Sequence, residues 1–375
     1  MIAVSGSGIA GLAAALAVLR NQIPLLLVAG STPATPLHGG VQIAPNGWAA
    51  LDQLGLGDAA RARATTLQAI KVRDMRSTVT LASLDLTASA YASLSRADLV
   101  SLLKAEINAA SGMTNIAANI THVVQRGPDQ GKEVHMLTDD SGRHIVDALI
   151  AADGVSGFGR HYVNGTDSGR DNAPNKGRVA MRAVARTTDL PRIFSQPFCN
   201  LWLGNGAHFV HYPLHGGRDV NMVLTLDKAK AGDDWKRRYL GRNDILGHLC
   251  DHADINWVKT TLSAHRYHDC WRRGQTVLAG DAAHPIPPNL AQGAGQSLVD
   301  AACLLRWLAD DNLDSALSGY ARERSKAVGV IFKKATVSSK IMALDGIGAA
   351  ARSTLIGLGG ETMLNAWLAE VWAAA

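Results

Sequence analysis

The N-terminal segment alternates between short apolar runs and one longer apolar stretch. Residues 2–5 form the first run, a glycine-rich turn follows, and an alanine- and leucine-rich stretch continues to about Asn21. A second short run covers residues 24–28. Short apolar runs bounded by turn residues are typical of buried strands, and a longer apolar stretch between them is typical of a helix. The segment is therefore predicted to be a βαβ unit.

The middle of the chain shows the alternation of apolar and polar positions that β-strands have. Residues 69–86 alternate like two paired strands, and residues 120–151 are predicted to form three strands. Between them, residues 95–98 are predicted to cap a helix that continues to residue 109. Residues 179–226 are again strand-rich, with turns rich in glycine. This pattern predicts a separate sheet that covers a shared cavity, in which a substrate would lie.

Residues 276–301 combine a predicted strand, a rigid turn and a helix. The strand covers residues 276–279, and the turn contains Asp281, His284 and several prolines. The run Gly293, Ala294, Gly295 is predicted to open a helix that continues through Trp307. The start of a helix offers unpaired N–H groups and a partial positive charge, which suit a phosphate or an anionic ring. Further helices are predicted near residues 313–335, before an apolar tail.

Composition and charge narrow the class of protein. The chain has 375 residues, of which 47% are hydrophobic and 18% charged, enough for two globular domains. The net charge of +5 comes without a basic run interleaved with aromatics, so a nucleic-acid partner is not expected. The four cysteines lack metal-ligand spacing, which predicts neither a metal site nor disulfides. No signal peptide or transmembrane segment is predicted, so a cytoplasmic location is expected.

The glycines that follow the first predicted strand have the spacing of a dinucleotide-binding turn. Gly6, Gly8 and Gly11 would allow a tight turn, close approach of a pyrophosphate and close packing of the helix, in that order. Such sites place an acidic residue at the end of the second strand, where this chain has Ala29. We interpret this difference as weakened or rearranged ribose recognition. A fold that no longer binds a nucleotide is the alternative.

Three motifs occur together in a familiar order: the glycine turn, the pair Asp153 and Gly154 followed by Arg160, and the run at residues 280–285. The set resembles the class A flavoprotein aromatic hydroxylases, the FAD-dependent monooxygenases of the p-hydroxybenzoate hydroxylase superfamily. Residues 208–213 and 290–296 resemble the salicylate and 6-hydroxynicotinate hydroxylase branch most. The resemblance covers roughly residues 1–335 and leaves out the C-terminal tail.

The resemblance implies an α/β fold with a Rossmann-like FAD-binding domain of the GxGxxG type, a β-sheet-rich substrate domain and C-terminal helices. The expected FAD-binding domain is discontinuous and consists of residues 1–70, 96–175 and 268–335. Residues 71–95 and 176–267 are expected to form the substrate domain, and a polar loop at residues 164–176 marks a boundary. Residues 336–375 form the tail, which is expected to pack on the flavin domain; a membrane-surface or dimer helix is the alternative.

The resemblance also implies which residues bind the cofactors. Arg96 would lie along the FAD, Asp281 would bond its ribityl or ribose part, and Pro287 would wall the flavin face. Asp153 and Gly154 resemble the loop that serves both FAD and the nicotinamide donor. The remaining implied cofactor residues hold the pyrophosphate or approach the flavin ring, and they are Gly6, Gly8, Ile9, Ala10, Gly11, Gly293, Ala294 and Gly295.

The reaction implied by the resemblance uses NADH or NADPH and O2. The enzyme would hydroxylate a small aromatic or N-heteroaromatic phenol, with or without decarboxylation, through a flavin C4a-hydroperoxide. A flavin monooxygenase for a larger hydrophobic substrate, such as a quinone precursor or polyketide, is one alternative. A degenerate flavin-binding scaffold without hydroxylase activity is the other, and Ala29 is its main support. A homodimer is left open.

The candidate catalytic residues lie on one predicted strand. Side chains alternate along a strand, so His208 and Tyr212 share one face while His211 points to the other. Related hydroxylases carry a histidine four residues before the Tyr-Pro pair, which favours His208 as the base that assists phenol deprotonation, with Tyr212 orienting the hydroxyl. The alternative is that His208 is an ordinary strand histidine, hydrogen-bonded to backbone and without a catalytic role. His215 is predicted to be exposed and His284 to be structural.

Overall fold

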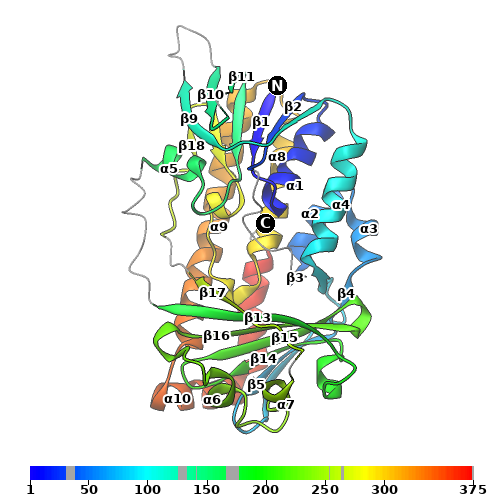
Figure 1. Ribbon diagram of the computed structural model, residues 1–375, viewed down its shortest axis with the longest axis vertical. Coiled ribbons are helices and arrows are strands. Elements are labelled where there is room, and N and C mark those ends of the chain that lie inside the picture. The colour runs from blue at the N-terminus through cyan, green and yellow to red at the C-terminus, as the bar shows by residue number, and fades with distance from the viewer. Residues whose placement is uncertain are drawn as a thin grey trace.

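The structure is a computed structural model that describes residues 1–30, 39–125, 133–140, 142–165, 177–252, 254–262 and 266–373. Most of the polar loop expected at residues 164–176 lies outside these ranges. The described chain has two large layers, one above the other in Figure 1, with helices α9 and α10 beside and between them.

A six-stranded sheet is the centre of the upper layer (Figure 1). Its neighbouring strands pair in parallel, apart from the antiparallel pair at one edge. The three central strands are completely buried, as expected for a parallel sheet covered on both faces. In spatial order the strands are β18 (Arg272–Arg273), β19 (Thr276–Leu278), β12 (Ala148–Ala151), β1 (Ile2–Ser5), β2 (Leu25–Val28) and β8 (Met113–Ile116).

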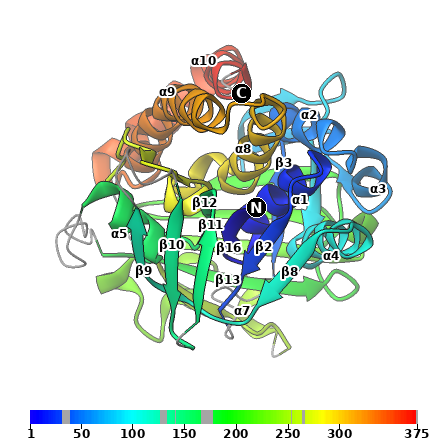
Figure 2. The same cartoon turned by 90° about the horizontal axis from the view of Figure 1, so that it is seen from above.

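Helices cover one side of this sheet and a small antiparallel sheet covers the other (Figure 2). The apolar side chains of both covers belong to one continuous core with the central strands. The helices are α1 (Ile9–Arg20), α2 (Pro45–Gln53), α3 (Gly57–Arg61), α4 (Arg96–Ala109) and α8 (Gly293–Trp307). On the other side lie β9 (Ile120–Gln125), β10 (Val134–Thr138) and β11 (Arg143–Val146), with α5 (Phe158–Asn164) nearby.

The lower layer is a seven-stranded sheet that is antiparallel except where β14 pairs with β5. Its lower face has a core of its own, closed by helices α6 (Trp235–Tyr239) and α7 (His248–Asp251). Its upper face meets the upper layer and helices α9 and α10. In spatial order the strands are β17 (Val258–Leu262), β13 (Arg178–Arg186), β16 (Asp219–Asp227), β15 (His208–Leu214), β14 (Phe198–Leu203), β5 (Ala69–Asp74) and β6 (Thr80–Asp85).

A second three-stranded sheet joins the two layers. Its strands are β3 (Gly40–Ile43), β7 (Ala92–Ser95) and β4 (Thr65–Thr66), with β7 in the middle. The Gly40 N–H donates to Asn221 Oδ1 of β16 at 2.9 Å, and the Ser93 hydroxyl donates to the Pro213 carbonyl of β15. A Cβ atom at Gly40 would lie 2.8 Å from the ring of Tyr212, so only glycine lets β3 approach the lower sheet this closely.

Two long helices complete the described chain: α9 (Leu313–Met342) and α10 (Gly346–Ala373). The expectation that the tail packs on the flavin domain is wrong, because α10 packs mainly on β6 of the lower sheet, through Leu364, Leu368 and Val371. Within the described residues, no single helix is both long and apolar enough to cross a membrane. Helices α9 and α10 meet that criterion only when taken together, as a pair bent by 116°.

Three boundaries differ from those expected. Residues 120–151 form four strands in two sheets, because Asp147 separates β11 from β12 and each then pairs in a different sheet. The boundary expected at residue 336 falls inside α9. Strand β7 pairs with β3 and β4 rather than with the seven-stranded sheet. The predicted helix starts at Arg96 and Gly293 are confirmed, and Ser95 Oγ accepts from the Asp98 N–H as an N-cap.

Candidate functional site

The three sequence motifs meet at the carboxyl ends of the parallel strands. A Cβ atom at Gly6 would lie 2.3 Å from the Ala152 carbonyl oxygen, directly before Asp153. A Cβ atom at Gly280 would lie 2.3 Å from the Cβ of Ala10. The buried guanidinium of Arg160 donates to the Ala282 carbonyl at 3.0 Å. The glycine turn, the Asp-Gly loop and the turn after β19 therefore form one edge, where α/β sheets bind their ligands.

The glycines at this edge fit a bound dinucleotide. Gly6 has φ of 104°, and a Cβ atom at Gly11 would lie 2.0 Å from the Gly6 carbonyl oxygen, so both serve close packing. Gly8, Gly154 and Gly293 instead face open space, with nothing within 4 Å of a Cβ placed there. Open backbone of this kind lets a large ligand approach main-chain N–H groups closely.

We predict that Gly11→Ala and Gly8→Ala separate packing from cofactor binding. Gly11→Ala places a methyl group against the Gly6 backbone, so the free energy of unfolding should fall by roughly 1–3 kcal/mol and FAD binding should be lost with it. Gly8→Ala meets no protein atom, so unfolding should change by less than about 0.5 kcal/mol while FAD affinity falls. Urea denaturation and FAD titration of the apoprotein measure the two effects. Equal destabilisation by both variants would contradict this assignment.

Two helix starts at the same edge have free backbone donors. Helix α1 begins after Gly8 and α8 begins after Gln292, and neither helix has a side-chain cap or an acidic residue in its first turn. Uncapped N–H groups and the positive end of the helix dipole attract a pyrophosphate or an anionic ring. Ile9 and Ala10 belong to the first turn of α1, while Ala294 and Gly295 belong to that of α8. The two helix starts thus fit an FAD molecule that extends along this edge, with α1 at one end and α8 at the other.

The other predicted cofactor residues lie along the same edge or near it. Asp281 is exposed directly after Gly280, and Pro287 is half-buried in the loop before α8. Arg96 is half-buried at the start of α4, and its N–H donates to the Gly39 carbonyl. Asp153 is desolvated, which raises its pKa; its Oδ2 accepts from the Gly159 N–H, and its buried Oδ1 has no partner among the described residues. Their contacts with FAD remain predictions.

The strand end that lacks the usual acid has an amide beside it. Ala29 is half-buried, and its N–H donates to the Ile116 carbonyl of β8. A Cβ atom at Gly30 would lie 2.4 Å from Asn119 Oδ1, and the Asn119 amide is held by Asp139 at 2.8 Å. The Asn119 amide, which follows the adjacent strand β8, therefore lies beside the position where the sequence has Ala29 and Gly30 instead of an acid.

Two surface hollows of about 520 and 550 Å³ lie at the opposite end of the same sheet. Both are lined by Asp147, Asp310 and Asp311, and the first also by Met1, the residue before β1. The hollows are open and acidic, and they are separated from the glycine turn by the length of β1. They suit neither an anionic cofactor nor the chemistry of the three motifs.

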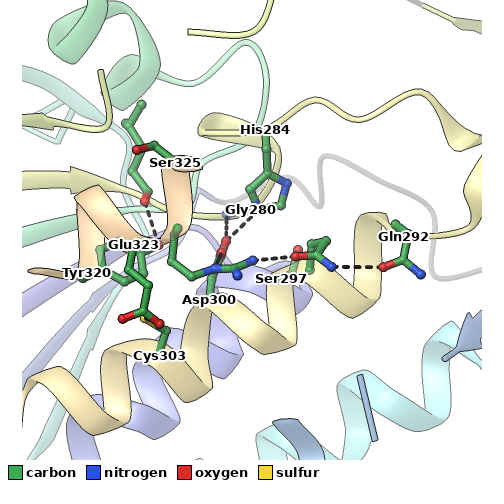
Figure 3. Close-up of polar contacts among 12 residues, drawn as sticks. Gly280, His284, Gln292, Ser297, Asp300, Cys303, Tyr320, Glu323 and Ser325 are labelled. Atoms are coloured by element: carbon green, nitrogen blue, oxygen red, sulfur yellow. Dashed lines mark hydrogen bonds and ion pairs between the residues drawn. The ribbon is translucent and has the colours of Figure 1, made fainter. Parts of the chain in front are cut away.

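A buried polar cluster lies beside the middle of α8, where Asp300 is its centre (Figure 3). Asp300 accepts from His284 Nε2 at 2.7 Å, from the Gly280 N–H at 2.9 Å and from Arg324 Nε at 2.9 Å. Burial alone would raise the pKa of Asp300, but attraction to His284 and Arg324 lowers it to about 2. The cluster fixes the turn after β19 to helices α8 and α9. His284 is fully buried in this cluster, as expected of a structural residue.

His208 lies on the upper face of the seven-stranded sheet, the face that meets the upper layer and helices α9 and α10. Its side chain is 5% exposed, and its Nδ1 has no partner among the described residues. Burial, together with the guanidinium groups of Arg178 and Arg352, lowers the pKa of His208 to about 3. The imidazole is therefore neutral at physiological pH, with an unpaired ring nitrogen inside the protein. Its role as a base remains a prediction.

The other candidate residues of β15 lie on the two faces of the sheet that strand alternation predicts. Tyr212 is buried four residues beyond His208, about 13 Å along the strand, and burial raises the pKa of its hydroxyl well above the usual value. His211 points into the lower core, with its ring centroid 4.5 Å from that of Phe194. His215 lies in the exposed turn after β15, where Nδ1 contacts Asp219 Oδ2 at 2.6 Å.

Sequence reasoning missed Arg182, which lies in the middle of β13. It pairs with Val223 of β16, which in turn pairs with Val210 of β15, so Arg182 shares the upper face with the strand of Tyr212. Its side chain is accessible to solvent, yet surrounding protein desolvates the guanidinium and lowers its pKa; the charge of Arg96 lowers it further. No hydrogen bond or ion pair joins Arg182 to another described residue. The sequence feature that could have identified it is the strand alternation in residues 179–186, which places an arginine in the middle of a strand on the face opposite to the buried apolar residues.

Comparisons with known proteins identify the family of this chain. A family model described as FAD binding domain matches residues 1–334. A 3-hydroxybenzoate 6-hydroxylase of Aquipseudomonas alcaligenes is 30% identical, and the alignment covers 95% of this chain and 93% of that protein. A 3-amino-4-hydroxybenzoate 2-monooxygenase of Streptomyces platensis is also 30% identical, over 89% of this chain and 86% of its own.

Solved structures show the same fold. HpxO of Klebsiella pneumoniae, complexed with FAD and uric acid, superimposes with a TM-score of 0.85 at 21% identity, covering 100% of this chain and 97% of that one. A salicylate hydroxylase substrate complex superimposes with a TM-score of 0.80 at 19% identity, again covering 100% and 97%. The predicted α/β fold with an FAD-type domain and a β-rich layer is confirmed. The chain belongs to the FAD binding domain family, among the class A FAD-dependent aromatic hydroxylases.

Proposed function

We propose that this FAD-dependent monooxygenase hydroxylates a small aromatic acid that carries a ring hydroxyl, using NADH or NADPH and O2. The observation that carries the substrate class is Arg182, a desolvated guanidinium on the upper face of the seven-stranded sheet near Tyr212 and Arg96, with no hydrogen-bond or ion-pair partner among the described residues. A carboxylate is the natural partner for such a group. The relatives named above act on hydroxybenzoates, which supports the same class.

FAD, when bound, would accept a hydride from the nicotinamide donor and activate O2. The chain's own residues bind and orient the partners. The uncapped starts of α1 and α8 offer N–H donors to the cofactor, and Leu290 and Ile286 pack with Val210 and Tyr212 in one apolar cluster. That cluster would exclude water from the place where oxygen transfer occurs. Arg182 would hold the substrate carboxylate.

His208 would accept the phenolic proton once an anionic substrate is present. In the free protein its pKa is about 3, which makes it a weak base. A substrate anion close to Nδ1 favours the charged imidazolium and raises this pKa toward neutrality, offsetting the effect of Arg178 and Arg352. The unpaired Nδ1 supports this role. With decarboxylation or without it, the proton leaves the ring hydroxyl by the same route.

The function is tested with a panel of aromatic substrates. The purified protein should contain FAD, and 3-hydroxybenzoate or a related acid should stimulate NADH or NADPH oxidation with formation of a hydroxylated product, identified by its mass. Larger quinone-like or polyketide substrates are the second arm of the panel. Product from these alone would replace the proposal with the larger-substrate alternative. A yellow protein that no aromatic stimulates would favour a flavin-binding scaffold, which is the outcome that Ala29 would explain.

We predict that His208→Asn lowers kcat for phenolic substrates by roughly 10²–10⁴-fold, the usual contribution of a general base. The loss should be largest at neutral pH and should shrink as pH approaches the pKa of the free phenol, near 10, because hydroxide then deprotonates the substrate without help. Steady-state kinetics between pH 6 and 10 give this profile. His215→Asn, in the exposed turn, is the matched control and should leave the profile unchanged. An unaltered profile for His208→Asn would remove the base assignment.

We also propose a cytoplasmic location and a homodimer. All four cysteines are free, which supports the cytoplasm, where thiols stay reduced. A homodimer is supported by the outer face of α10, where Ile347, Leu355 and Leu358 are exposed. Light scattering of the purified protein would distinguish a dimer from a monomer.

A further inference from the structure

A line of hydrogen bonds runs from helix α9 to the first residue before α8 (Figure 3). Arg324 Nη2 donates to Gln296 Oε1 at 2.5 Å, and Gln296 Nε2 donates to Gln292 Oε1 at 3.0 Å. From the other side, Asn46 Nδ2 of α2 donates to the same Gln292 oxygen at 2.9 Å. All four side chains are buried, with exposed fractions between 0% and 4%. Gln292, the N-cap residue of α8, is the end of this line.

The direction of every hydrogen bond in this line is determined by groups that can only donate. A guanidinium has no acceptor, so Gln296 must present its oxygen to Arg324 and its NH2 to Gln292. The Gly47 N–H likewise requires Asn46 to present its oxygen at 2.9 Å and its NH2 to Gln292. Gln292 Oε1 therefore receives two donors, which fixes its amide orientation. Its NH2 group makes no hydrogen bond to another described residue and is not among the completely buried unpartnered groups, so this nitrogen reaches the small exposed part of the side chain.

We propose that Gln292 donates an amide N–H to the flavin ring at the start of α8, and that Gln296 and Arg324 are positioning residues that set the direction of this donor. The inference rests on the FAD site proposed above. Gln292 is 1% exposed and is followed by Gly293, whose Cβ position faces open space. An amide in a buried side chain whose NH2 lacks a protein partner costs free energy unless water or a ligand satisfies it. A ring that carries acceptor atoms, and negative charge when reduced, is such a ligand.

The donor adds to the positive end of α8. A reduced flavin is anionic, so an amide N–H aimed at it forms a charge-assisted hydrogen bond, whereas the oxidised ring receives only a neutral one. The stronger bond favours the reduced form. Asp300 holds Arg324 at the other end of the line, so the orientation of Gln292 depends on residues that never touch the cofactor. The buried cluster around Asp300 would thus influence the equilibrium between oxidised and reduced flavin.

The test compares three glutamine-to-leucine variants in the full-length protein. Gln292→Leu removes the donor, and Gln296→Leu removes one of the two hydrogen bonds that orient the Gln292 amide. Gln275→Leu is the matched control, a buried glutamine outside the line. The flavin midpoint potential and the FAD affinity of the apoprotein are measured for each. Gln292→Leu should weaken binding of reduced relative to oxidised FAD about tenfold, as expected for one charge-assisted hydrogen bond. Gln296→Leu should shift the ratio in the same direction by a smaller factor.

Each outcome decides the proposal. Unchanged potentials in Gln292→Leu, with FAD bound, would overturn the donor role. A shift in Gln292→Leu without one in Gln296→Leu would overturn the positioning role. An equal shift in Gln275→Leu would identify general destabilisation as the cause. If the unsubstituted protein binds no FAD, the proposed cofactor site fails, and this failure is distinguished because it appears before any variant is compared.

Discussion

Replacing Arg324 with leucine is expected to lower the free energy of unfolding by about 3–5 kcal/mol, the cost of breaking a buried ion pair by removing one partner. The substitution leaves the Asp300 carboxylate inside the protein with only His284 and the Gly280 N–H as partners. It also leaves Gln296 Oε1 without its donor. Urea denaturation in the presence of saturating FAD measures the change.

The control for this prediction is Arg322→Leu, on the exposed side of the same helix, which should change stability by less than about 0.5 kcal/mol. The double variant Arg324→Leu with Asp300→Leu should recover part of the loss, because no buried charge is then left alone. If the double variant were no more stable than Arg324→Leu, the loss would come from packing rather than from the unpaired carboxylate.

The same ion pair predicts the acid sensitivity of the fold. The pKa of Asp300 is about 2 in the folded protein and about 3.9 in an unfolded chain, so the folded state binds the proton less readily. The stabilisation is complete above pH 4 and is lost as pH falls from about 4 to 2. Asp300→Asn should remove that part of the pH dependence. Its cost at neutral pH should be similar to that of Arg324→Leu, because the asparagine leaves the buried Arg324 guanidinium without a carboxylate partner.

The sequence predicts the nucleotide-binding half of the fold well because its signals are local. Gly6 and Gly11 lie within a few residues of the elements they connect, and a Cβ atom at either would overlap neighbouring backbone. The helix beginning at Gly293 and the cap at Ser95 are likewise determined by nearby residues. Strand alternation also predicted that His208 and Tyr212 share a face opposite to His211.

The remainder depends on contacts between distant segments. Arg324 has no motif around it, and its partners Asp300 and Gln296 come from another helix. The surroundings of His208 include Arg352 from α10, a helix outside the family resemblance, so its lowered pKa could not be expected from strand position. The position of the tail differs from the expected one for a related reason: an apolar helix without a charge pattern does not indicate which of two apolar surfaces it will cover.

Substitution of Arg182 with leucine is expected to raise KM for a hydroxybenzoate roughly 10–150-fold, since hydrogen bonds to charged groups contribute about 1.5–3 kcal/mol. The upper end applies if the bound substrate excludes water from the guanidinium, and the lower end if Arg182 stays as accessible as it is in the free protein. FAD binding should not change, because Arg182 belongs to the lower sheet.

Two comparisons make this prediction specific. Arg186→Leu, on the same strand and the same face, removes an exposed arginine that pairs with Asp219 at 3.4 Å and should leave KM unchanged. A phenol that lacks the carboxylate should bind weakly to the unsubstituted enzyme and equally weakly to Arg182→Leu, because neither complex contains the ion pair. If Arg182→Leu weakened both substrates alike, the residue would act through the shape of the sheet rather than through charge. The carboxylate would then have to be held elsewhere on the same face, where Arg178 beside His208 is the next guanidinium along β13.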